Sequence, residues 1–247
     1  MVDLSAAIIT RNEAQNIGPC LDSLHWVSEV VVLDQFSEDG TVETAASRGA
    51  RVFQEAWRGF AAQKNLALDR TTRPWVLSID ADERVTEPLR AEIETVVERD
   101  GPEDGYYIAR RNYFCGRWIR YGGWYPDYSL RLFRRGLGRF EDRAVHEKVV
   151  VQGRTGYLKQ PLEHFTYVSV SDYLQRMDRY SGLAARELAL GGGEARWHHL
   201  VLRPLFTFLK MYGLKLGFLD GRAGFFLAVS YAYYTFLKYY RLGSDPA

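Results

Sequence analysis

The sequence predicts an α/β fold in which a Rossmann-like, mostly parallel central sheet is followed by a C-terminal helical region. In the first hundred residues, apolar runs of strand length alternate with segments whose apolar residues recur at helical spacing. Such alternation implies right-handed crossovers between neighbouring strands, and therefore a parallel sheet. From residue 171 the pattern is helical, with one break at residues 191–193.

The helices of the first part are indicated by spacing and by their ends. Ile17, Leu21 and Leu24 recur at helical spacing, and Pro19 fits a helix that begins near Asn16 because proline is tolerated in a first turn. Strands are expected at residues 4–10, 30–34, 51–54 and 75–79, and further helices at residues 41–48, 59–70 and 87–99. After residue 105 the pattern changes to short β-like pieces at residues 106–110 and 129–133.

Composition limits the class of protein. The 247 residues are 47% hydrophobic, which is enough for one large or two small domains, and the formal net charge of +1 gives no reason to expect a nucleic-acid partner. Two cysteines exclude a disulfide scaffold and suit a reducing, cytoplasmic compartment. We expect no signal peptide, because residues 1–12 lack a basic start and a long apolar stretch.

A pair of acids, Asp80 and Asp82, follows the buried strand expected at residues 75–79. Side chains two apart on an extended backbone point to the same side, and this end of a strand lies at the edge where open α/β sheets bind ligands. Two close anions repel unless a positive group lies between them, and Mg²⁺ or Mn²⁺ prefers oxygen ligands. The alternative is a solvated turn whose acids cap the next helix.

Two other strand ends also carry polar residues. Thr10, Asn12 and Glu13 end the first strand, and Asp34 begins the polar segment 34–41 after the second. Each alone has a structural explanation as a helix cap or a turn. The glycine motifs of dinucleotide-binding folds and of P-loops do not occur in the sequence.

Together these segments resemble the nucleotide-sugar-binding segments of the inverting family 2 glycosyltransferases, which have a GT-A fold. The segments are I-I-T-R-N-E (8–13), L-D-Q-F-S-E-D-G-T (33–41) and L-S-I-D-A-D-E-R (77–84). Residues 57–65, 113–133, 142–147 and 164–167 extend the similarity toward the lipopolysaccharide core β-1,4-glucosyltransferase branch. The resemblance covers roughly residues 4 to 240, and Gln35 departs from it where a small residue is expected.

The resemblance implies a role for each matching residue. Asp34 would accept a hydrogen bond from the uracil N3–H of a UDP-sugar donor, Asp80 would contact the ribose or the metal, and Asp82 would bind an Mg²⁺ or Mn²⁺ ion that bridges the diphosphate. His164 could add a metal ligand or a diphosphate contact, although a lone histidine is more often structural. The other residues implied to line or border the nucleotide pocket are Thr10, Asn12, Glu13, Gln63, Lys64 and Asn65.

Inverting transfer needs a base that takes the proton of the acceptor hydroxyl. The candidates are Glu147 and Asp142, which we regard as equal, in an acidic cluster at residues 140–147. His146 in the same cluster could contact metal or diphosphate. Salt bridges with neighbouring arginines are the alternative explanation of this cluster.

Residues 110–143 contain nine arginines and three acids. Because guanidinium pairs well with phosphate, this stretch predicts an anionic acceptor such as a phosphorylated inner-core sugar on a glycolipid. A solvated strand face without a ligand is the alternative.

Residues 196–241 contain seven basic residues, one acid and dense aromatics. This composition suits helices that lie in the interface of an anionic membrane, which would place the protein peripherally on the cytoplasmic face of the inner membrane. The longest nearly uncharged run, residues 223–237, is 15 residues, whereas about 20 are needed to span. The alternative is a helical pair packed on the rest of the chain or on a second copy in a homo-oligomer.

We therefore expect a catalytic domain at residues 1–170 and a helical region for membrane binding or oligomerisation at residues 171–247. In the catalytic domain, about residues 1–100 would form the nucleotide-sugar half and residues 101–170 the acceptor half. The expected function is metal-dependent transfer of a hexose, glucose by preference. Two alternatives are a non-catalytic nucleotide- or sugar-binding protein at a membrane surface and, with less support, a phosphatase with an aspartate nucleophile.

Overall fold

The structure, a computed structural model, describes residues 1–141 and 148–244. It divides into two compact units, each formed by two stretches of chain. The first unit comprises Met1–Arg110 and Tyr128–His164, and the second comprises Arg111–Asp127 and Phe165–Ala247. The functional division expected at residue 170 stays a prediction.

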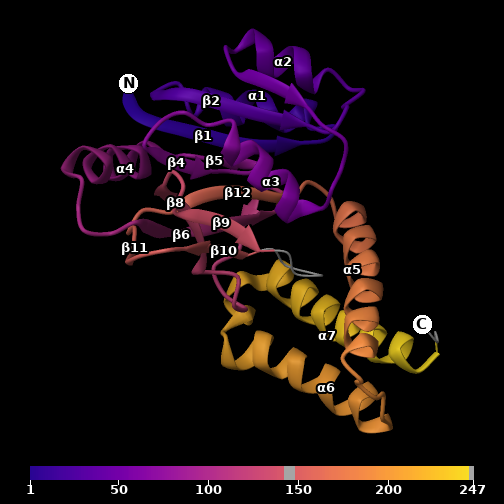
Figure 1. Cartoon of the computed structure of the whole chain (residues 1–247). Helices are drawn as coiled ribbons and strands as arrows, with labels where there is room; N and C mark the ends of the chain where they lie inside the picture. Colours follow the sequence, from indigo (N-terminus) through magenta and orange to yellow (C-terminus); the bar gives the residue numbers. More distant parts are fainter. Residues whose placement is uncertain (142–147, 245–247) are drawn as a thin grey trace. The chain divides into compact units, whose positions relative to one another are not determined.

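Four parallel strands form the part of the sheet that carries the predicted ligand edge (Figure 1). They are β1 (Val2–Thr10), β2 (Val27–Asp34), β3 (Arg51–Gln54) and β4 (Trp75–Ser78), in the order β3-β2-β1-β4. β1 and β2 begin earlier than predicted, because Val2 and Val27 are buried and lie opposite each other in register. At the other end of the pair, Thr10 lies opposite Asp34.

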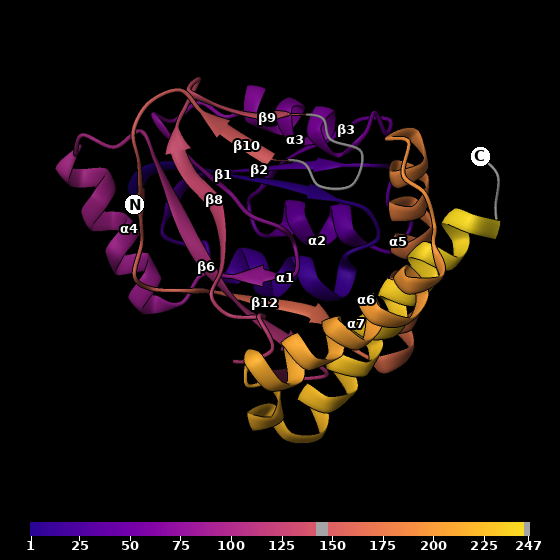
Figure 2. The same ribbon diagram turned by 90° about the horizontal axis from the view of Figure 1, so that it is seen from below.

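The sheet continues beyond β4 with strands that form after residue 105, in the order β4-β8-β6-β12-β5. β4 and β8 are antiparallel, and Figure 2 shows β6 beside β8. Two short strands, β7 and β11, pair with β6, while β9 and β10 form a separate two-stranded sheet. The bounds are β5 (Glu83–Arg84), β6 (Gly105–Phe114), β7 (Arg117–Trp118), β8 (Asp127–Arg134), β9 (Gly138–Glu141), β10 (Lys148–Val151), β11 (Thr155–Tyr157) and β12 (Leu162–Tyr167).

Alternate side chains of the parallel strands enter two separate cores, as the pleat of a strand requires. Leu4, Ala6 and Ile8 join a cluster that contains side chains of α1 (Ala14–Asp22), α2 (Thr41–Ser47) and α4 (Glu87–Arg99). Ala7 and Val76 join the other cluster, with α3 (Phe60–Asp69) and the β9–β10 pair. Both layers of the predicted α/β fold are therefore present.

The helix α1 begins at Ala14, not near Asn16 as predicted. The carbonyl of Glu13 already accepts hydrogen bonds from the amides of Asn16 and Ile17, at 2.9 and 2.8 Å. Pro19 consequently lies inside the helix rather than in its first turn. The sequence signal was correct for the helix and wrong for its start.

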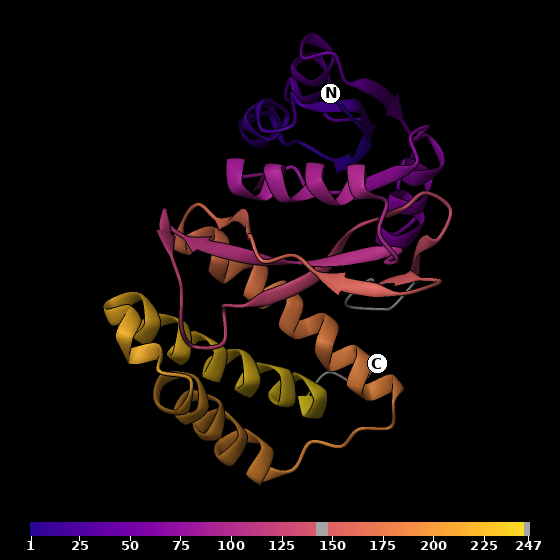
Figure 3. The ribbon, with the colours of Figure 1, turned by 90° about the vertical axis from the view of Figure 1, so that its left-hand side faces the viewer.

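The second unit is built around long helices. They are α5 (Val170–Leu190), α6 (Trp197–Leu209) and α7 (Gly221–Ser244), and the last two are joined by the short turns η1 (Lys210–Leu214) and η2 (Gly217–Asp220). α6 and α7 lie side by side in Figures 1 and 3. None of the described helices combines the length and apolar character needed to cross a membrane. The core residues of the unit are Phe114, Ile119, Trp124, Tyr173, Met177 and Leu227.

Candidate active site

Asp34 is fixed at the carboxyl edge of the parallel strands. Its side chain has no exposed surface, and Thr10 on the neighbouring strand donates its hydroxyl to Oδ2 at 2.8 Å. The backbone N–H of Ser37 donates to Oδ1 at 2.8 Å, the Ser37 hydroxyl donates to Oδ2, and the Gln54 amide reaches Oδ1 at 3.5 Å. The carboxylate of Asp34 is therefore oriented by donors from both adjacent strands and from its own loop.

The loop after β2 is bonded to the loop after β1. Asn12, in the left-handed conformation at φ 54°, accepts the Glu38 N–H on its side-chain oxygen at 2.9 Å, and its own N–H donates to the Ser37 hydroxyl at 2.7 Å. The N–H of Glu13 donates to the Thr41 hydroxyl at 2.8 Å. Asparagine tolerates this backbone conformation better than most residues. Asn12 thus shapes the edge of the candidate nucleotide pocket rather than capping α1.

The three predicted residues on α3 have different surroundings. Lys64 is almost buried and places Nζ 3.1 Å from Oδ1 of Asp80. The Asn65 amide exchanges two hydrogen bonds of 2.9 Å with the backbone of Phe140, and so joins α3 to β9. Gln63 donates to the Glu55 carbonyl at 3.3 Å, while its buried Oε1 has no donor among the described residues. Lys64 reaches Asp80, whereas the Asn65 side chain joins α3 to β9.

Asp80 is paired with two cations. Oδ2 accepts from Nη2 of Arg131 at 2.7 Å, and Oδ1 faces Lys64. Burial alone would raise the pKa of the Asp80 carboxyl, but Arg131 and Lys64 outweigh burial and hold that pKa well below its usual range. Asp80 is therefore an anion whose charge is already compensated by the protein.

Glu83 completes a buried network beneath this carboxylate. It has no exposed surface, accepts Nη2 of Arg131 at 2.6 Å and accepts the backbone N–H of Asp80 at 2.8 Å. Burial would lower the pKa of Arg131, but the two carboxylates raise it above its usual value. The sequence contained a signal for Arg131, because an arginine within the apolar strand 129–133 is rarely buried without acids to pair with. The prediction of an anion-binding stretch at residues 110–143 did not separate Arg131 from the other eight arginines.

Asp82 lies in different surroundings from Asp80. The extended backbone of β4 ends at Ser78, and residues 81–82 form a turn, so the same-side argument for extended residues does not apply to the pair. β12 lies antiparallel to β5 with His164 opposite Glu83, and this register places Nε2 of His164 3.4 Å from Oδ2 of Asp82. A carboxylate and an imidazole at this distance are two potential ligands for a divalent cation, and the imidazole could also contact the diphosphate that the cation binds.

The described residues contain no group of three or more His, Cys, Asp or Glu side chains arranged to hold a metal ion. Asp82 and His164 supply two side chains that can be metal ligands, whereas the carboxylate of Asp80 is paired with Lys64 and Arg131. A divalent cation that also takes phosphate oxygens as ligands therefore fits Asp82 and His164 better than Asp80.

The two base candidates, Asp142 and Glu147, lie outside the described residues, as does His146. The roles predicted for these three residues therefore stay predictions.

Several of the nine arginines predicted to bind an anionic acceptor have partners within the protein. Arg131 pairs with Asp80 and Glu83, and Arg134 lies 2.7 Å from Asp100. In the second unit, Arg120 stacks over the ring of Trp118 at 4.2 Å. These contacts support structural roles for part of the arginine stretch.

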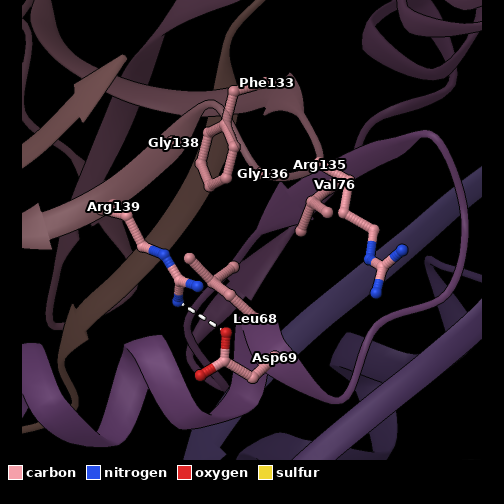
Figure 4. A pocket seen from close by; sticks show the side chains of 8 residues that line it. All are labelled: Leu68, Asp69, Val76, Phe133, Arg135, Gly136, Gly138 and Arg139. Carbon is pink, nitrogen blue, oxygen red and sulfur yellow. Dashed lines mark ion pairs between the residues drawn. The ribbon is translucent and has the colours of Figure 1, made fainter. Parts of the chain in front are cut away.

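A cavity of about 310 Å³ lies near the start of β4, at the end of that strand away from Asp80 (Figure 4). Its apolar side chains are Leu68, Val76 and Phe133, and Asp69 binds Arg139 at its rim with an N–O distance of 2.6 Å. None of the predicted nucleotide, metal or base residues lines it, whereas Arg135 and Arg139 of the arginine stretch do.

The family model of glycosyl transferase family 2 matches residues 5–165. The chain belongs to this family. That stretch contains the three strand ends, Lys64, Asp80 and His164, so the residues of the candidate site all lie within the family domain. The predicted family, its glycosyltransferase activity and its GT-A fold are confirmed.

Proteins described as glycosyltransferases align with nearly the whole chain. The "lipopolysaccharide core biosynthesis glycosyltransferase LpsC" of Rhizobium meliloti is 34% identical over 95% of this chain and 89% of its own length. An "uncharacterized glycosyltransferase" of Rickettsia felis is 28% identical over 98% of this chain and 90% of its own. Among solved structures, the mannosyltransferase PcManGT of Pyrobaculum calidifontis has a TM-score of 0.58 at 16% identity, over 98% of this chain and 87% of that one. This last similarity concerns the fold.

Proposed function

We propose that this family 2 enzyme transfers a hexose, glucose by preference, from a UDP-sugar to an inner-core lipopolysaccharide or a similar lipid-linked glycan, with inversion at the anomeric carbon. The observation that carries the proposal is the arrangement at the carboxyl ends of the parallel strands. Buried Asp34 ends β2, charge-compensated Asp80 follows β4, and Asp82 pairs with His164 of β12. The name of the Rhizobium meliloti relative supports the class of acceptor.

We propose that Asp82 and His164 hold a divalent cation, Mg²⁺ or Mn²⁺. Such an ion compensates the charge that grows on the departing diphosphate. The Pyrobaculum calidifontis protein that shares the fold is in complex with GDP-Man and Mn²⁺. In this proposal Asp80, fixed by Arg131 and Lys64, takes the ribose contact rather than the metal contact, because both of its oxygens already face cations.

Asp34 can accept the uracil N3–H only after a local change. Its two oxygens already accept from Thr10, from Gln54 and twice from Ser37. A carboxylate offers about four acceptor sites. We therefore propose that the Ser37 hydroxyl rotates away from Oδ2 when UDP binds, which leaves Thr10 to hold the carboxylate in place.

We assign a single-displacement mechanism to the transfer, in which the base takes one proton. The acceptor oxygen forms a bond to the sugar C1 while the bond from C1 to the diphosphate oxygen breaks, and the hydroxyl proton passes to the carboxylate of Glu147 or Asp142. Replacement of the true base by its amide should lower turnover by about 10²–10⁴-fold and leave donor binding intact. The Asp80 carboxylate, paired with Arg131 and Lys64, is poorly suited to the alternative role of a phosphatase nucleophile.

The test is UDP release from a panel of UDP-hexoses with Mn²⁺ or Mg²⁺ and a lipid-linked, phosphorylated acceptor. We expect acceptor-stimulated release with UDP-glucose, and its loss in either Glu147→Gln or Asp142→Asn. Binding of UDP-sugars without turnover of any of them would favour the non-catalytic alternative. Near-normal turnover in both amide variants would place the base elsewhere.

A lipid-linked acceptor implies that the enzyme works at a membrane surface. We propose peripheral attachment through residues 196–241 on the cytoplasmic face of the inner membrane. The basic composition of this segment supports the proposal.

A further inference from the structure

One face of α6 exposes an unusual amount of apolar surface. The helix contains no buried residue, although it packs beside α7 (Figure 3). Its large apolar side chains at three- and four-residue spacing are each more than half exposed, and such spacing places them along one side of a helix. These residues are Trp197, Val201, Leu202, Leu205, Phe206 and Leu209.

The turns that follow α6 continue this surface. In the segment 210–222, named here the tip, Leu214 is 77% exposed and Leu219 is 50% exposed, with Leu216 and Phe218 only slightly less so. Leu216 adopts the left-handed conformation at φ 57°, which is unfavourable for a residue other than glycine. Gly217 has no room for a side chain, because a Cβ there would lie 2.6 Å from the Met211 carbonyl oxygen. The tip therefore presents large apolar side chains where solvated turns commonly have polar ones.

The charges on this surface have a single sign. Asp220 is the only acid in residues 195–244, and it is buried, where it accepts the backbone N–H groups of Arg120 and Tyr121 at 3.3 and 2.8 Å. Lys210 and Lys215 are exposed and form no ion pair with any described residue; the same is true of Arg222. The exposed tip thus combines apolar side chains with uncompensated positive charge.

This combination selects one class of partner. A second copy of the chain, docked through the same face, would bring its own lysines against these lysines without a carboxylate to separate them. An anionic lipid surface offers both a hydrocarbon layer for the leucines and phosphates for the basic groups.

We propose that the tip inserts into the interfacial layer of a membrane that contains anionic lipid, with Leu214, Leu216, Phe218 and Leu219 below the headgroups and Lys210, Lys215 and Arg222 at their phosphates. The exposed apolar face of α6 would bind the same membrane. This assignment rests on the membrane attachment in the proposed function and names the segment that performs it.

The test is co-sedimentation of the full chain with vesicles of phosphatidylethanolamine and phosphatidylglycerol, in parallel with UDP binding in the presence of Mn²⁺. Each basic group near an anionic surface contributes about fivefold to binding. The double variant Lys210→Glu, Lys215→Glu should therefore lose at least about 25-fold in vesicle affinity, and wild-type binding should fall steeply with added salt.

A second double variant, Leu214→Ser with Leu219→Ser, should lose vesicle binding by at least about tenfold while its melting temperature stays near that of the wild type. The matched charge control is Lys159→Glu with Arg186→Glu, two exposed positions outside the tip and α6, and it should bind vesicles within about threefold of the wild type. All variants should keep wild-type affinity for UDP. The experiment therefore tests the proposed UDP site and the proposed membrane-binding surface independently of each other.

Wild-type protein that stays in the supernatant with anionic vesicles at low salt would overturn the proposal. It would also be overturned if both tip variants sedimented like the wild type, or if the wild type were a dimer that the leucine variant dissociates. In the last case a second copy covers this face.

Discussion

In the first unit, the half-buried Asp80 pairs with buried Arg131 and Lys64. In the second unit, Lys210 and Lys215 face solvent and form no ion pair with a described residue. The apolar residues divide in the same way, since Ile8 and its neighbours fill a core while the leucines of the tip are exposed. A buried charge must be compensated within the protein, because desolvation without a partner costs several kcal/mol. Exposed charge of one sign beside exposed apolar surface is a mark of a partner outside the chain. The two regions therefore have to be tested by different measurements, one of stability and ligand binding and the other of surface binding.

The strongest way to break the compensated region is Arg131→Met. This variant leaves Asp80 and Glu83 beside each other with one of their cations removed, and loss of one partner of a buried ion pair costs about 3–5 kcal/mol. Urea unfolding should show that loss. Arg135→Met is the matched control, since its exposed side chain forms no ion pair with a described residue and its loss should change stability by less than about 0.5 kcal/mol. Equal stability of the two variants would refute the compensated network.

A smaller effect is expected in the second unit from Gly224→Ala. A Cβ at Gly224 would overlap the backbone carbonyl of Gly217, on the other side of the turn, so α7 would have to move away from η2. Overpacking of this kind costs typically about 1–3 kcal/mol. Gly213→Ala is the matched control, because a Cβ there meets nothing within 4 Å. If thermal unfolding did not separate the two variants, the tip would be less rigid than the structure indicates.

The smallest effect concerns acid pH. The pKa of Asp80 is depressed in the folded state by Arg131 and Lys64, against the opposing effect of burial. Its contribution to stability is therefore complete above the unfolded pKa of aspartate, about 3.9, and is lost as the pH falls through the folded value. The stability difference between wild type and Arg131→Met should shrink as the pH is lowered below about 4. A difference that stays constant down to the lowest pH at which both proteins fold would contradict the assignment.

The fold could be predicted from local sequence patterns, whereas the candidate site could be predicted only in part. The apolar runs located all four parallel strands, and the polar strand ends correctly located Asp34 and Asp80 at one edge of the sheet. The pairing of Asp80 with Arg131 could not be predicted, because it depends on the antiparallel register of β4 with β8 across 51 residues of sequence. The apolar strand around Arg131 indicates that this arginine pairs with acids, but it does not indicate which ones.

Side-chain roles that depend on tertiary contacts were also beyond the sequence. Asn65 matched the family pattern for the nucleotide pocket, yet its amide is bonded to the backbone of Phe140. The basic and aromatic composition of residues 196–241 was visible in the sequence. The sequence did not show which of those aromatic residues are exposed, because their exposure depends on how α6 packs against α7. Tyr239 is buried, for example, and Phe206 is exposed.

The central claim is that the edge formed by β1, β2 and β4 binds a nucleotide diphosphate through a divalent cation. Calorimetric titration with UDP, in the presence of Mn²⁺ and again in EDTA, tests it most directly. We expect tight binding to the wild type only with Mn²⁺, and equally weak binding with and without the ion in Asp82→Asn. Arg135→Met serves as the control and should bind like the wild type. Metal-independent binding by the wild type, or unchanged Mn²⁺-dependent affinity in Asp82→Asn, would contradict the claim.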